Sequence, residues 1–160
     1  EDEESESELK SALSLLQRKL GYGVLCCYLA ILVKCRILEV DWRTPSLDYH
    51  TLMKLTWIIS RSNASDTEQM FHCMCFNVFA HNCDDHAKNL SWIYDPQQDC
   101  WYPSPAYDLT WRTTYFGEHT TTVDGNGKDP GFAELHAIDK AAGIIAKVCR
   151  KIAGEIQEKT

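Results

Sequence analysis

Residues 76–109 read FNVFAHNCDDHAKNLSWIYDPQQDCWYPSPAYDL, and this stretch decides the fold. An apolar run ends at Ala80, a polar loop follows over residues 81–89, and two short aromatic-rich runs come next, at Leu90–Tyr94 and Cys100–Tyr102. The two runs are separated by Asp95–Asp99, a connection typical of a β-hairpin. The stretch therefore predicts a helix, a polar loop and a hairpin, in that order.

Helical spacing of apolar residues dominates on both sides of this stretch. Helices are predicted over Leu47–Ile59, Thr67–His81, about Phe132–Ala142 and about Ile145–Gln157. Gly143 marks the break between the last two, and Thr120–Gly131, rich in Thr, Gly, Asp and Asn, is expected to be loop. The predicted fold class is mainly α with one small β-hairpin.

The beginning of the chain has a different character. Six of the first eight residues are acidic, an amphipathic helix is predicted over residues 9–20, and Val24–Val33 is a fully apolar element. We therefore divide the chain into residues 1–36, of uncertain role, and a C-terminal unit over residues 37–160. The ten apolar residues at Val24–Val33 fall far short of the ~20 that span a bilayer.

Charge and cysteine content narrow the classes of function. The 160 residues carry a formal net charge of −7, so no basic face is expected for direct nucleic-acid binding. Of the eight cysteines, Cys26 and Cys27 are adjacent and Cys73 and Cys75 are one residue apart, which suits a disulfide framework poorly. With no secretory signal recognised, we expect reduced, mostly buried thiols in a cytoplasmic protein with no membrane contact.

The polar loop holds the residues that carry chemistry. Asp84 is followed five residues later by Asn89, and Asp108 comes after the predicted hairpin. Phosphotransfer to a hydroxyl uses one carboxylate at the nucleophile, a nearby amide oxygen on magnesium and a second aspartate on the metal, and protein kinases arrange these groups in this order. The pattern predicts that Asp84, Asn89 and Asp108 converge on one cleft.

The same residues resemble the HipA-type kinases of bacterial toxin–antitoxin systems. The run Phe76–Ser91 is similar to that family's helix and catalytic loop, and Trp101–Leu109 is similar to its metal-binding segment. Shorter likenesses occur at Thr44–Tyr49 and Gly117–His119. The resemblance covers roughly residues 37–158 and implies a protein-kinase-like C-terminal lobe.

Carried over residue by residue, the resemblance implies that Asp84 is the catalytic base and that Asn89 and Asp108 bind Mg²⁺. His86 and Lys88 fall on motif positions that shape the loop or contact the phosphates of ATP. Asp85 is expected to be a solvated or a loop-stabilising neighbour. The implied activity is transfer of the ATP γ-phosphate to a serine or threonine of a protein substrate. The implied partner is a HipB-like DNA-binding antitoxin, so that any contact with DNA is indirect.

The chain also departs from the family pattern. His72, Cys73 and Cys83 stand where basic or small polar residues are expected. The nucleotide-binding lobe of a kinase needs a glycine-rich loop and a lysine, for which residues 21–24 and Lys34 are poor candidates. We therefore expect a C-lobe fragment, a decayed copy, or one half of a split kinase whose N-lobe is separately encoded.

Two alternatives come from other classes of function. A non-catalytic interaction module derived from such a kinase could retain the lobe without phosphotransfer. A zinc-binding domain is the other, because Cys and His are the ligands that zinc favours. Its candidate ligands lie within fifteen residues but lack paired Cys-x2-4-Cys spacing: His72, Cys73, Cys75, His81, Cys83 and His86.

Overall fold

A computed structural model of the chain describes residues 47–86, 89–95, 97–112, 114 and 117–160. The predictions made for the beginning of the chain lie outside the described residues. These are the acidic run, the helix over residues 9–20, the apolar element at Val24–Val33, and the glycines and lysine of residues 21–34. The division between residues 1–36 and 37–160 stays a prediction.

Four helices make up the largest share of the regular structure in the described residues: α3 (Tyr49–Ile59), α4 (Ala64–Phe79), α5 (Phe132–Ala141) and α6 (Ala146–Gln157). Each begins and ends within one turn of the helix predicted from apolar spacing. Gly143 separates α5 from α6 with a φ of 65°, a left-handed conformation that glycine adopts without steric penalty. The mainly α class and the break at Gly143 are confirmed.

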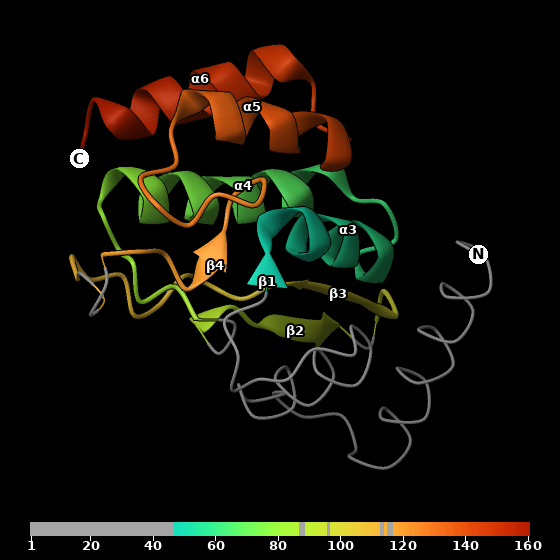
Figure 1. Ribbon diagram of the computed structural model, residues 1–160. Helices are drawn as coiled ribbons and strands as arrows, with labels where there is room; N and C mark the ends of the chain where they lie inside the picture. Colours follow the sequence, from blue (N-terminus) through green and yellow to red (C-terminus); the bar gives the residue numbers. More distant parts are fainter. Residues whose placement is uncertain (1–46, 87–88, 96, 113, 115–116) are drawn as a thin grey trace.

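The helices form two layers beside the strands (Figure 1). Helix α4 lies in the middle, with α3 packed beside it, and α5 and α6 cover the face turned away from the strands. Side chains from all four helices form one core around α4, including Leu52, Phe71, Met74, Leu135 and Ile152. No helix among the described residues is long and apolar enough to cross a membrane.

The predicted hairpin is confirmed. Strands β2 (Trp92–Asp95) and β3 (Cys100–Pro103) pair antiparallel, with Tyr94 opposite Trp101. Their rings lie 5.2 Å apart between centroids, a distance typical of a favourable aromatic pair. Trp92 is buried and its Nε1 donates to Thr56 Oγ1 of α3 at 3.2 Å, which fixes the hairpin on the helical core. Trp92, Tyr94 and Trp101 therefore serve packing.

The expectation of loop throughout Thr120–Gly131 is wrong at one place. Thr121–Thr122 form β4, which pairs in parallel with β1 (Leu47–Asp48). Leu47 is accordingly in a strand instead of in the first turn of the following helix. Two residues are too few for a recognisable strand pattern, and the partner is remote in sequence, so local reading could not find this pairing. The β1–β4 pair matters because β4 also holds the polar loop.

Candidate functional site

The polar loop starts from a well-defined helix end. Helix α4 stops at Phe79, and His81 adopts a left-handed φ of 49°. The amide of Asn82 donates to the carbonyl of Asn77 at 2.9 Å, and that of His81 donates to Val78 at 3.3 Å. This pair of bonds is a Schellman motif, which reverses the chain after a helix. It brings the side chain of Asn82 back over the last turns of α4.

Asp84 lies at the border between protein and solvent, where its carboxylate meets a histidine ring and an arginine. His86 Nε2 lies 2.8 Å from Oδ1, and Arg112 Nη1 lies 3.0 Å from Oδ2. The Asp84 side chain is 21% exposed and that of Arg112 is 67% exposed. Arg112 is held there by its backbone, since its carbonyl accepts from the amide of Cys83 at 2.9 Å. Sequence analysis missed Arg112, because no local pattern relates it to the loop.

Asp85 is buried, with 1% of its surface exposed. Its Oδ1 accepts from the amides of Thr120 and Thr121 at 2.9 and 3.1 Å. Its Oδ2 accepts from Tyr49 at 3.2 Å and lies 3.1 Å from Nδ1 of the buried His119. Of the two expectations for Asp85, loop stabilisation is therefore right and solvation is wrong. The residue anchors the polar loop to β4 and α3.

Asn89 is the last residue of the polar loop, and the backbone of Asp108 contacts the beginning of the loop at Asn82. Asn89 Nδ2 donates to the backbone carbonyl of Asp84 at 2.9 Å. Asp108 has a left-handed φ of 55°, and its carbonyl accepts from Asn82 Nδ2 at 3.4 Å. Asn89 Oδ1 and the exposed Asp108 carboxylate bind no other group of the described residues. Lys88 lies outside the described residues.

These oxygens suit a hard cation. Mg²⁺ prefers carboxylate and carbonyl oxygens, and proteins commonly supply one or two ligands while phosphates and water complete the shell. Asn89 leaves its amide oxygen available because its nitrogen makes the bond to Asp84. The donor set at Asn89 and Asp108 is therefore chemically compatible with magnesium.

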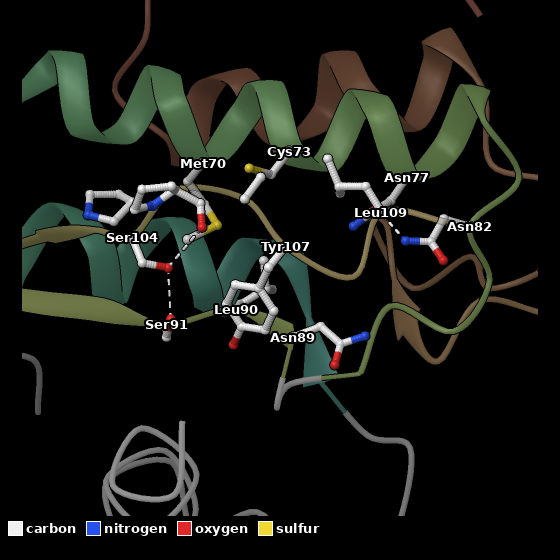
Figure 2. A pocket seen from close by; sticks show the side chains of 13 residues that line it. Met70, Cys73, Asn77, Asn82, Asn89, Leu90, Ser91, Ser104, Tyr107 and Leu109 are labelled. Atoms are coloured by element: carbon white, nitrogen blue, oxygen red, sulfur yellow. Dashed lines mark hydrogen bonds between the residues drawn. The ribbon is translucent and has the colours of Figure 1, made fainter. Parts of the chain in front are cut away.

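A small pocket lies beside the polar loop and the segment that bears Asp108 (Figure 2). Asn77 and Asn82 lie at one end of the pocket and Ser91 and Ser104 at the other. Asn89 lines the same pocket as Tyr107 and Leu109, the residues on either side of Asp108. Its volume of about 20 Å³ is room for about one water molecule. Thus Asn89 and the segment that bears Asp108, which are remote in sequence, share one wall.

The zinc alternative gains no support from the described residues. Among them, no three or more His, Cys, Asp or Glu side chains are grouped so as to hold a metal ion. Burial raises the pKa of the Cys73 and Cys83 thiols, and that of Cys75 well above its ordinary value. Cys75 belongs to the buried core and Cys73 packs against it, which is the packing role of a small apolar side chain.

Comparison with known proteins adds one finding. The family model described as HipA-like C-terminal domain matches residues 28–160. No curated protein matches the chain. No solved structure matches it either.

Proposed function

The chain belongs to the HipA-like C-terminal domain family, and from that premise we propose that it is the C-terminal lobe of a protein serine/threonine kinase. It would transfer the γ-phosphate of ATP to a protein hydroxyl, as the toxin of a toxin–antitoxin pair in the cytoplasm. One observation carries the proposal. Asn89 binds the backbone of Asp84 and lines one pocket with the residues that flank Asp108.

The proposed roles follow from position and chemistry. Asp84 accepts the proton of the substrate hydroxyl, whose oxygen then attacks the γ-phosphorus while ADP leaves. Asn89 and Asp108 hold Mg²⁺, which when bound neutralises charge on the phosphates. His86, whose ring contacts Asp84, orients that carboxylate. For Lys88, which lies outside the described residues, a phosphate contact is proposed from the family resemblance alone.

The partners are proposed by the same family membership. A DNA-binding antitoxin of the HipB type would bind the kinase, so that DNA contact is indirect. The glycine-rich loop and lysine that cover the nucleotide would come from an N-lobe, which a neighbouring coding sequence could supply. A protein with an accessible serine or threonine would be the substrate.

The test is phosphotransfer from radiolabelled ATP with the candidate N-lobe present. The Asp84→Asn variant is expected to lose activity by about 10²–10⁴-fold, because general acid–base catalysis contributes on that order. Asp124→Asn is the matched control, since Asp124 Oδ1 also meets a histidine, His50 Nε2, at 2.9 Å, but Asp124 lies outside the polar loop. Equal losses in both variants would contradict the role given to Asp84.

A non-catalytic interaction module is the second candidate, and the surroundings of Asp84 favour it. Both carboxylate oxygens are engaged, one by His86 and one by Arg112. Two of the roughly four acceptor sites of the carboxylate are then occupied, which restricts how a substrate hydroxyl can approach it. With the N-lobe present, ATP binding without phosphotransfer, in the unaltered chain and in Arg112→Ala alike, would support the module. Phosphotransfer by either protein would support the kinase.

A further inference from the structure

Four buried polar side chains connect the two ends of the candidate site. Tyr49 hydroxyl donates to Asp85 Oδ2 at 3.2 Å, and Asn77 Nδ2 donates to the Tyr49 oxygen at 2.9 Å. Asn82 Nδ2 donates to Asn77 Oδ1 at 2.9 Å and to the carbonyl of Asp108 at 3.4 Å. We call Asp85, Tyr49, Asn77 and Asn82 the buried polar network. It begins next to Asp84 in sequence and ends on the backbone of Asp108.

The direction of every bond in the network is fixed by chemistry. The ionised Asp85 carboxylate can only accept, so Tyr49 must donate to it and accept from Asn77. This arrangement orients the Asn77 amide, whose oxygen is then presented to Asn82. Burial, together with the charge of Asp85, raises the pKa of Tyr49 well above its ordinary value, so the hydroxyl keeps the proton that it donates. The network therefore has one arrangement.

One atom of the buried network also lacks a protein partner in the described part of the chain. Its four members are at most 4% exposed. Asn82 Oδ1 is buried and has no hydrogen-bond partner among the described residues. An unsatisfied buried polar atom is unfavourable, and native proteins keep few of them. An apolar side chain at this position would avoid the penalty but would release the Asp108 carbonyl.

We propose that the buried polar network is a positioning device, which sets the place of the Asp108 segment relative to Asp84 and Asn89. Tyr49 and Asn77 are then positioning residues for metal binding, although neither contacts the metal. Tyr49 belongs to α3 and Asn77 to α4, so the rigid helical core determines the spacing of the loop. This inference rests on the proposed function, because it takes Asn89 and Asp108 as the metal ligands.

The experiment uses the full chain labelled with ¹⁵N and titrated with Mn²⁺, a paramagnetic substitute for Mg²⁺, in the presence of ATP, whose phosphates complete the shell of the ion. In the unaltered chain, amide signals near Asn89 and Asp108 should broaden together. Tyr49→Phe removes only the hydroxyl, and Asn82→Ala cuts the network at its other end. Each is expected to weaken Mn²⁺ binding by about 10–100-fold, as loss of groups that orient metal ligands typically does. In both variants, the Mn²⁺-dependent broadening should be weakened more strongly for the amide signal of Asp108 than for that of Asn89.

Thr56→Val is the matched control. Thr56 is fully buried in α3 and its hydroxyl bonds Leu52 and Trp92, so its loss also removes buried hydrogen bonds, but away from the network. It should leave Mn²⁺ binding unchanged. If neither Asn89 nor Asp108 responds to Mn²⁺ in the unaltered chain, the proposed function fails. If both respond and folded Tyr49→Phe or folded Asn82→Ala binds as tightly as the control, only the positioning role is overturned.

Discussion

The adjacent residues Asp84 and Asp85 should differ greatly in how much the same substitution destabilises the protein. Asp85→Asn replaces one carboxylate oxygen by an amide nitrogen, which is a donor. Every group that faces the carboxylate offers a hydrogen: the Thr120 and Thr121 amides on one oxygen, and Tyr49 and the ring of His119 on the other. Either orientation of the amide therefore sets donor against donor. Breaking a buried charged interaction costs about 3–5 kcal/mol, a large part of the ~5–15 kcal/mol that stabilises a typical domain.

Asp84→Asn should have a much smaller effect on stability. The carboxylate of Asp84 pairs with His86 and Arg112 at the surface, and the Arg112 side chain is 67% exposed. Surface pairs contribute about 0–1 kcal/mol, because solvent screens them. Urea unfolding followed by circular dichroism measures both variants against the unaltered chain. The reasoning is refuted if Asp85→Asn stays within about 1 kcal/mol of that chain, or if Asp84→Asn destabilises it as much.

Three further outcomes are expected. His81→Gly should raise the free energy of unfolding by roughly 0.5–1 kcal/mol in urea titrations, because His81 holds the left-handed φ of 49° at the end of α4; a decrease would contradict this. Burial raises the pKa of the Cys149 thiol to about 12. The protonated thiol therefore contributes fully to stability below the unfolded pKa of ~8.5, and this contribution is lost as the pH rises toward the folded pKa. Cys149→Ala should therefore reduce the alkaline slope of stability by up to about 1.4 kcal/mol per pH unit, and an unchanged slope between pH ~9 and ~11 would oppose the assignment. The Gly131 amide and then the Asn126 side chain lower the pKa of Glu134, so its contribution is present above the unfolded pKa and lost as pH falls through the folded one. Glu134→Gln should be less stable than the unaltered chain at neutral pH and should approach it near pH ~3, as unfolding curves at the two pH values will show.

Much of the fold could be predicted from the sequence because local patterns encode it. The helices α3 to α6 follow apolar residues spaced for one buried face, and the hairpin follows two aromatic runs on either side of a short connection. The pairing of β1 with β4 could not be predicted from the sequence. It is held by contacts such as Asp48 Oδ2, which accepts from Thr122 Oγ1 at 2.6 Å and from the Gly125 amide at 2.8 Å. Contacts of this kind, between segments that are remote in sequence, produce no periodic sequence pattern in either segment.

The sequence by itself determined the residue types and order of the candidate site, because the spacing of Asp84, Asn89 and Asp108 is a property of the chain. It also determined the family, since the match to residues 28–160 depends on sequence alone. Only the tertiary structure decided which of two neighbouring aspartates faces solvent. Asp84 meets an exposed arginine and a histidine, whereas Asp85 meets the amides of β4, a tyrosine of α3 and a buried histidine. The physical reason is that a carboxylate can be buried only where enough hydrogen-bond donors surround it, and here those donors come from segments remote in sequence.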